Sequence, residues 1–358
     1  MTSKKRLLPL GFIALVLAIA LAAVASDPAG AWQVVRQGWD HPTVLATALE
    51  DFLRENLPFR QQLREGVLGL RMLGGSVEEN GLCLLENGLI PILEVTDDAT
   101  IHRGNTRQIL RVVQQSDTPA YLMLLPTACA IYADDLPGYL PLYNQRNFIE
   151  STYQQFYGSA VTVDAYNALL YSESDYLYYR TEDSLAPLGG YEVYQALAPR
   201  LGFTETPLEQ YEVSYLDHSY YGGLYDQWSY GGVRPDVITV YRDASSQAVS
   251  RVVNWERFSQ QTYYTLYPEE AAASGEAMDA ILGGEAPRIE IETLGARDSS
   301  LLVLGDRTAL SFLPFLTGHY GKITFLDFSL LTASEIAQFN PEDYSQVLFA
   351  YSLDTYLN

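Results

Sequence analysis

The chain has 358 residues, of which 48% are hydrophobic, and 44 acidic against 22 basic residues give a formal net charge of −22. This apolar content supports a large buried core and excludes a chain that is disordered throughout. Phosphate backbones are repelled by such a negative charge, so a nucleic-acid partner is not expected. The length fits one large α/β domain or two smaller ones.

The N-terminus carries a targeting signal. Lys4-Lys5-Arg6 precedes Leu7–Ala25, which holds no charged residue. The segment ends in Ala23-Val24-Ala25, which fits a signal-peptide cleavage site, yet it is also long enough to span a bilayer. Both a cleaved signal peptide and a retained anchor fit. In either case the positive flank places everything after Ser26 outside the cytoplasm, anchored in the cytoplasmic membrane or secreted.

The spacing of apolar residues and breakers then predicts the elements in chain order. Residues 1–26 are the targeting segment, and 27–78 form a neck with helices at 43–56 and 61–73. Residues 80–92 form a hairpin, because Asn87-Gly88 accepts a tight turn. The next expected elements are helix 100–115, strand 120–125, helix 144–156, strand 161–165 and helix 187–197.

Residues 205–300 are predicted to form a β-rich insertion, with strands at 237–241, 250–255 and 261–266. Regular alternation returns after it. The expected elements are strand 301–304, helix 309–317, strand 323–328, helix 333–339 and strand 346–351. This alternation predicts a three-layer α/β domain over 79–358, built on a mostly parallel sheet.

The residues that usually bind metals or cofactors are sparse. None of the four histidines (His41, His102, His218 and His319) has metal-ligand spacing, and no phosphate-binding loop is present, so we expect no metal and no cofactor. We expect His319 to sit at a helix C-terminus. Cys83 and Cys129 each lie in an apolar run, which favours two buried free thiols.

An aromatic and glycine-rich segment, Tyr220–Gly232, lies inside the predicted insertion. Its tyrosines and tryptophan could form a lid that stacks on sugars, or they could simply pack the loop. If it is a lid, Tyr221 and Trp228 are candidate ligand-binding residues, together with the adjacent His218.

Strand 301–304 runs through Gly305-Asp306-Arg307-Thr308 into a predicted helix. Hydrolases use such a strand–turn–helix to present a nucleophile beside backbone N–H groups that stabilise an oxyanion. The turn therefore marks one half of a candidate active site.

With this turn and several further stretches, the chain resembles the DHHW-type proteins of bacterial envelopes. These are SGNH-like relatives of enzymes that O-acetylate exopolysaccharides. The stretches that carry the resemblance, in order along the chain, are Phe52–Arg60, Asn80–Leu89, Leu125–Tyr132, Leu136-Pro137, Tyr178–Gly189 and Ser311–His319. The resemblance implies an SGNH-like fold with its active site at the turn.

The chain departs from the family at the chemical centre of both motifs. The first family motif reads Tyr-Arg-Thr-Asp-His-His-Trp followed by Pro-Leu-Gly. Here the Tyr-Arg-Thr before the centre and the Pro-Leu-Gly after it are kept, and we call them the family frame. The centre itself reads Glu182, Asp183, Ser184 and Leu185. The second family motif reads Lys-Asp-Ser, in which the serine is the nucleophile. The corresponding residues of this chain are Gly305-Asp306-Arg307.

These replacements remove the parts of an acyl-transfer mechanism. Arg307 has no nucleophilic lone pair, and Ser184 cannot act as a base near neutral pH. No catalytic residue of the family set is intact. We predict instead an ion pair between Glu182 and Arg307, with Asp183 or Asp306 as a second acceptor.

The leading hypothesis is a catalytically inactive, extracytoplasmic member of the family. It would bind glycan, with Tyr179 and Arg180 as further candidate contacts, or act as a partner in envelope or exopolysaccharide modification. The alternative is an active carbohydrate esterase or O-acetyltransferase with relocated residues, for which Thr308, Ser311 and His218 are candidates. A histidine nitrogen within about 3.2 Å of a serine or threonine hydroxyl would favour that alternative.

Overall fold

The computed structural model describes residues 24–38, 52, 66–71, 77–95, 100–228, 230–243, 249–274, 277–294 and 298–358. The chain divides into two compact units, one of residues 77–228 with 233–358 and the other of residues 1–76 with 229–232. In the second unit, α2 (Pro28–Gly38) and residues 66–71 are helical. The predicted boundaries of the neck stay a prediction.

Among the helices that the structure describes, none combines the length and apolar character that crossing a bilayer requires. Nearly all of the predicted apolar segment Leu7–Ala25 and of the predicted helix at 43–56 lies outside the described residues.

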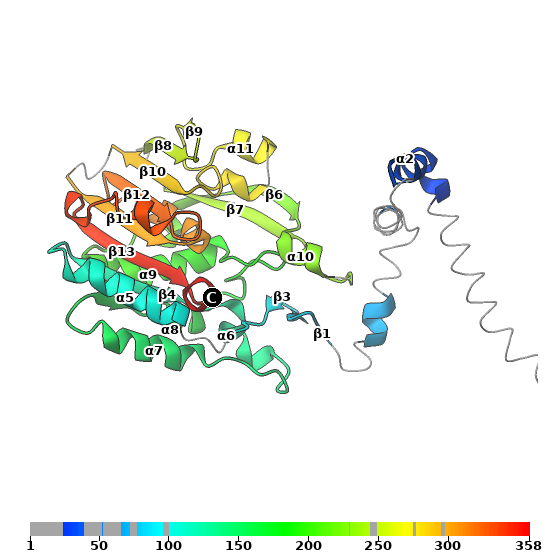
Figure 1. The fold of residues 1–358 in the computed structure, drawn as a ribbon, viewed down its shortest axis with the longest axis horizontal. Helices are drawn as coiled ribbons and strands as arrows, with labels where there is room; N and C mark the ends of the chain where they lie inside the picture. Colours follow the sequence, from blue (N-terminus) through cyan, green and yellow to red (C-terminus); the bar gives the residue numbers. More distant parts are fainter. Residues whose placement is uncertain are drawn as a thin grey trace, which may run out of the picture. The chain divides into compact units, whose positions relative to one another are not determined.

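The larger unit is built on a sheet of eight strands within its described part (Figure 1). In spatial order the strands are β5 (Val161–Val163), β4 (Ala120–Leu125), β13 (Gln346–Ser352), β11 (Ser300–Gly305), β12 (Lys322–Asp327), β10 (Arg288–Thr293), β8 (Val249–Trp255) and β9 (Gln260–Tyr263). The order from β5 to β12 is parallel throughout.

The prediction of a mostly parallel sheet needs correction, because β10, β8 and β9 join it antiparallel. These strands come from the predicted β-rich insertion, which extends the central sheet. A turn of only four residues links β8 to β9, and a connection that short can join only antiparallel strands. The rest of the insertion includes the two-stranded ribbon of β6 (Tyr211–Tyr220) and β7 (Asp236–Asp243).

Helices cover both faces of the sheet. On one face, residues of α5 (Thr100–Gln114) line a pocket together with Phe349 and Tyr351 of β13. Gln346 of the same strand points to the opposite face, because side chains alternate along a strand, and it donates a hydrogen bond to the carbonyl of Leu201 at the end of α9 (Pro187–Leu201). Parallel strands covered on both faces read as continuous apolar runs, which explains the fully buried sequence of β4.

The remaining described elements of this unit are short. They are β1 (Glu78–Glu79), β2 (Leu82–Leu85), β3 (Gly88–Pro91), α6 (Ala128–Ile131), η1 (Ala133–Asp135), α7 (Gln145–Gln155), α8 (Ala165–Leu170), η2 (Leu208–Gln210), α10 (Gly223–Gln227), α11 (Glu269–Ser274), η3 (Ala277–Ala280), η4 (Arg307–Ser311), α12 (Leu313–Leu316), α13 (Ala333–Ile336), η5 (Pro341–Asp343) and α14 (Leu353–Leu357). The predicted hairpin is confirmed as β2 and β3.

The predicted helix at 309–317 is instead two short helices, η4 and α12, with Phe312 between them. Pro314 explains the break, because it has no N–H to continue the hydrogen bonds of the preceding turn. Gly190 of α9 lies directly against η4: a Cβ at this position would be 2.2 Å from the carbonyl oxygen of Ser311. This contact between backbones fixes α9 beside the turn that follows β11.

We expect Gly190→Ala to lower the free energy of unfolding by about 1–3 kcal/mol, because the methyl group would meet backbone that cannot rotate away. Gly104→Ala in α5 is the matched control, since a Cβ there meets nothing within 4 Å. It should raise stability by up to about 1 kcal/mol through helix propensity. Denaturant titration measures both, and equal effects of the two variants would contradict the close contact.

Candidate functional site

The two motif segments meet at the C-terminal edge of the parallel strands. Gly305-Asp306-Arg307 begins at the last residue of β11. The other segment forms a turn that is closed by an antiparallel bridge between Tyr178 and Leu185 and that leads into α9. The Tyr178 hydroxyl donates a hydrogen bond of 2.8 Å to the carbonyl of Pro126, which follows β4. Ligands of open α/β sheets bind at this edge.

Asp236, at the start of β7, holds the backbone of the first motif. Its carboxylate is fully buried and accepts hydrogen bonds from the backbone N–H groups of Arg180, at 2.7 Å, and Thr181, at 2.8 Å. The hydroxyls of Thr181 and Tyr176 also donate to it, each at 2.5 Å. Sequence reasoning missed Asp236, because nothing near it in the sequence distinguishes it from other acidic residues.

Glu182 is the buried acid of the motif. Its Oε2 accepts a hydrogen bond of 2.8 Å from the Gly223 N–H and a longer one, of 3.4 Å, from the Tyr220 hydroxyl. Gly222 lies so close that a Cβ there would be 2.4 Å from the same oxygen. The start of α10 is therefore packed directly onto this carboxylate.

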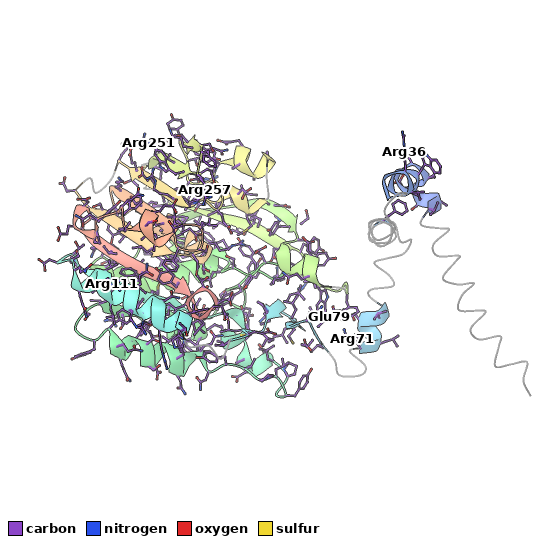
Figure 2. All side chains as sticks on the ribbon, viewed as in Figure 1. Arg36, Arg71, Glu79, Arg111, Arg251 and Arg257 are labelled. Atoms are coloured by element: carbon purple, nitrogen blue, oxygen red, sulfur yellow. The ribbon has the colours of Figure 1, made fainter. Side chains whose placement is uncertain are left out.

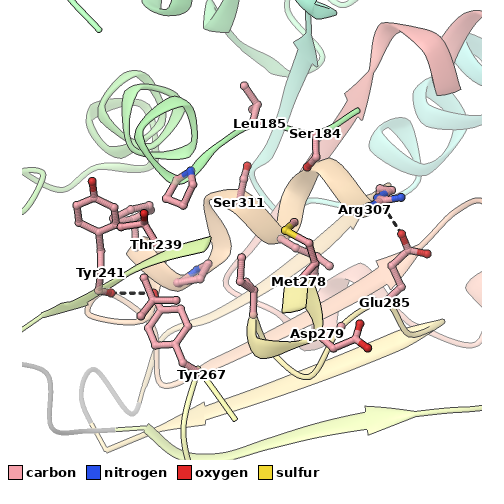
Figure 3. Close-up of a pocket in the computed structure, with 17 residues that line it drawn as sticks. Ser184, Leu185, Thr239, Tyr241, Tyr267, Met278, Asp279, Glu285, Arg307 and Ser311 are labelled. Atoms are coloured by element: carbon pink, nitrogen blue, oxygen red, sulfur yellow. Dashed lines mark hydrogen bonds and ion pairs between the residues drawn. The ribbon is translucent and has the colours of Figure 1, made fainter. Parts of the chain in front are cut away.

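The predicted ion pair between Glu182 and Arg307 is present, with Oε1 3.1 Å from Nη2. The second acceptor differs from the prediction: it is Glu285, whose Oε1 lies 2.8 Å from Nε of Arg307 (Figure 3). The carboxylate of Asp306 instead accepts the N–H groups of Thr308, at 2.9 Å, and Ser352, at 2.7 Å. Asp306 therefore caps η4 and ties it to the end of β13.

Two pockets adjoin each other at Ser184, Leu185 and Arg307. The larger has a volume of about 480 Å³, and Figure 3 shows tyrosines at one end and the Arg307–Glu285 pair at the other. Its further lining residues include Thr239, Tyr241, Tyr267, Met278, Asp279, Ser311 and Phe315. The smaller, of about 110 Å³, is lined among others by Asp183, Asp306, Thr308 and Asp354.

Asp183 is a carboxyl group of this site with a raised pKa. Desolvation by its surroundings, and then the negative charges of Asp354 and Glu182, raise the pKa of Asp183 to about 6, against the smaller opposing effect of Arg307. The side chain nevertheless keeps solvent-exposed surface. We therefore expect this raised pKa to affect stability less than it would in a fully enclosed carboxylate.

The histidines and hydroxyl groups proposed for a relocated acyl-transfer site can be located within the described residues. Among the described histidines, the one ring-nitrogen hydrogen bond joins Nε2 of His319 to the Tyr194 hydroxyl, at 2.7 Å. His319 also stacks on Phe203, and burial lowers its pKa. The Ser311 hydroxyl donates to the carbonyl of Thr308 at 2.7 Å. No ring nitrogen of a described histidine is therefore hydrogen-bonded to a serine or threonine hydroxyl.

The other candidate ligand-binding residues lie apart from the two pockets. Tyr179 and Trp228 are buried, and the Tyr179 hydroxyl has no hydrogen-bond partner among the described residues. Tyr221 is exposed and pairs with the ring of Tyr225. His218 is exposed on β6, and Arg180 lies over the Tyr176 ring beside another pocket. A role in binding stays a prediction for all five.

In the described ranges, no three histidine, cysteine, aspartate or glutamate side chains are placed to share a metal ion. Cys83 and Cys129 are both buried and free, as predicted. Burial, with a smaller contribution from Glu78, raises the pKa of Cys83 to about 11 and keeps that thiol protonated.

One protein family and several solved structures resemble this chain. A family model described as DHHW protein matches residues 95–325. A DHHW family protein from Eubacterium siraeum is similar in structure, at 20% identity and a TM-score of 0.65, over 79% of this chain and 94% of that one. Bacillus cereus PatB1, in a structure with a sulfonyl adduct, matches at 16% identity and a TM-score of 0.64, over 77% and 96%. At such identities these likenesses show a shared fold.

A further match is the O-acetyltransferase domain of Pseudomonas putida AlgJ, at 14% identity and a TM-score of 0.47, over 77% of this chain and 92% of that one. No curated protein matches the chain by sequence.

We expect Arg307→Met to lower the free energy of unfolding by about 1–2 kcal/mol, because it leaves the buried Glu182 carboxylate without its cation. In a Glu182→Gln background the same change should cost less, since no buried charge remains. The double-mutant cycle isolates this coupling.

The matched control is Arg251→Met. Arg251 pairs with Glu292 at the surface, where both side chains are over a third exposed (Figure 2). Its loss should change stability by at most about 0.5 kcal/mol. If Arg307→Met costs no more than Arg251→Met, the inner ion pair has no structural role.

The raised pKa of Asp183 predicts that the stability of the fold depends on pH. Its pKa of about 6 in the folded chain exceeds an unfolded value of about 3.9, so folding favours the protonated form. The resulting stabilisation is present at low pH and is lost as pH rises through about 6. Asp183→Asn should therefore raise the melting temperature above this pH and leave it unchanged well below. The exposed Asp117→Asn is the control variant, and a rise of the Asp183→Asn melting temperature confined to low pH would contradict the assignment.

Proposed function

Because this chain belongs to the DHHW protein family, we propose that it is a non-catalytic, extracytoplasmic member that binds glycan in the pocket beside Arg307. Its role would lie in cell-envelope or exopolysaccharide modification, alone or as the partner of a modifying protein. The N-terminal basic and apolar segment supports the location outside the cytoplasm.

The observation that carries the non-catalytic part is the state of Arg307. It stands at the family's nucleophile position, and its guanidinium is held between Glu182 and Glu285. A guanidinium keeps its charge and cannot attack a carbonyl carbon. Ser184, which replaces a family histidine, cannot accept a nucleophile's proton near neutral pH. The missing groups are the nucleophile and the base together, so the acyl-enzyme route has no first step.

The binding part is supported by what remains of the cleft. The pocket of about 480 Å³ lies in the size range of small-ligand sites. Tyr241, Tyr267 and Phe315 offer apolar ring surface, and the hydroxyls of Ser311 and Thr239 lie on its wall. Aromatic faces with hydroxyl groups around them suit sugar rings, which have apolar faces and polar edges.

We expect the full native chain to leave a chromogenic acetyl ester unhydrolysed above the rate of a heat-denatured sample. Saccharide oligomers should raise its melting temperature, because a ligand that binds only the folded state stabilises it. Tyr241→Ala should abolish that rise by removing a ring from the pocket. Spectrophotometric ester assays and thermal-shift measurements check the two expectations.

A variant that restores three of the family residues, with Glu182→Asp, Ser184→His and Arg307→Ser combined, serves as the positive control. PatB1 has been solved with a sulfonyl adduct, so a sulfonyl fluoride is a suitable probe. Mass spectrometry should find the probe at position 307 of the variant and nowhere in the native pocket. Steady ester turnover by the native chain that is lost on Ser311→Ala, Thr308→Val or His218→Ala would refute the non-catalytic part. The absence of any shift with saccharides would refute the binding part.

A further inference from the structure

The two adjoining pockets are surrounded by far more negative than positive charge. Six carboxylates line them or pair with their wall: Asp279, Glu285, Glu182, Asp183, Asp306 and Asp354. Among the described residues that line either pocket, Arg307 is the one basic side chain. Its Nη2 and Nε already pair with Glu182 and Glu285, so its charge is largely compensated.

The charge of the whole chain acts in the same direction. A net charge of −22 produces a negative potential that a cleft with low-dielectric walls concentrates. A uronate or a phosphorylated sugar would enter against this potential and find no uncompensated cation in the pocket lining. A protonated amine would be attracted by the same negative potential.

The pocket also has the surfaces that an amine-bearing sugar needs. Asp279 and Glu285 line the end that holds Arg307, and Tyr241 and Tyr267 line the opposite end (Figure 3). The Tyr267 hydroxyl donates to the carbonyl of Tyr241 at 2.7 Å, which holds the two tyrosines together. Aromatic rings attract both the apolar face of a sugar and a nearby ammonium group.

We propose that this pocket takes a saccharide with free amino groups, such as a de-N-acetylated hexosamine chain, in preference to neutral or uronate chains. The inference rests on the proposed glycan binding and adds the charge class of the ligand. The ammonium group pairs with Glu285 or Asp279, while the sugar ring packs against the tyrosines. Neutral chains keep the ring contact and lose the ionic one, and uronates add repulsion.

The test is titration calorimetry of the full chain with three oligomers of equal length, at mildly acidic pH and low salt. They are β-1,4-linked glucosamine, its fully N-acetylated counterpart and galacturonate. We expect the glucosamine oligomer to bind about tenfold more tightly than the acetylated one, as one partly screened ion pair allows, and the uronate to show no binding. Added salt should reduce the preference.

Glu285→Gln and Asp279→Asn should each bring the affinity for glucosamine toward that for the acetylated oligomer. Glu285→Gln leaves Arg307 paired with Glu182, so the pocket wall is kept. The matched control is Glu150→Gln on α7, an exposed residue that lines neither pocket, and it should leave the preference unchanged.

Equal affinity for the two hexosamine oligomers would overturn the charge preference and leave the proposed glycan binding intact. The charge preference would also be overturned if Glu150→Gln reduced the affinity for the glucosamine oligomer as much as Glu285→Gln does, because the preference would then reflect overall charge. Tight uronate binding would also overturn it. The absence of heat with all three oligomers would contradict both the preference and the glycan binding beneath it.

Discussion

A carboxylate that is almost entirely buried must be surrounded by donors, and Glu182 is the buried charge on which the geometry of this site depends. Its two oxygens reach the backbone at Gly223, the Tyr220 hydroxyl and the guanidinium of Arg307. An ionised carboxylate without such partners would cost several kcal/mol. The motif turn, the start of α10 and the turn after β11 are therefore held in one arrangement by a single side chain.

Asp236 is a second buried carboxylate that is surrounded by hydrogen-bond donors. Two successive backbone N–H groups and two hydroxyls converge on its carboxylate, which fixes the peptide planes immediately before Glu182. Gly88 of the β2–β3 hairpin also contacts this backbone, where a Cβ would be 2.4 Å from Cα of Arg180. The backbone at Arg180 and Thr181 is thus held by contacts that do not involve the residues at the chemical centre of the motif. This explains how the family frame persists while that centre has changed.

The sequence could predict what local patterns determine. Apolar runs correctly placed β4, β11 and β13, and the motif positions correctly paired Glu182 with Arg307. It could not identify Asp236 or Glu285, which are single residues among 44 acids and reach the site only through the tertiary fold. The antiparallel part of the sheet was missed for a similar reason: strands were predicted at 250–255 and 261–266, but a local pattern does not show which strands they pair with, and β10 was not predicted.

The contact between Gly222 and Glu182 bears on how this site can evolve. Glutamate is one methylene longer than the aspartate of the family motif, and a glycine beside it leaves room for the longer arm. A lone return of residue 307 to serine would strip the buried acid of its cation, and a lone return of residue 182 to aspartate would withdraw the acid from its donors. Each first step costs stability before nucleophile and base coexist. The packing therefore opposes each of these single substitutions, and the family's residues at 182 and 307 are compatible with a stable fold only when several positions change together.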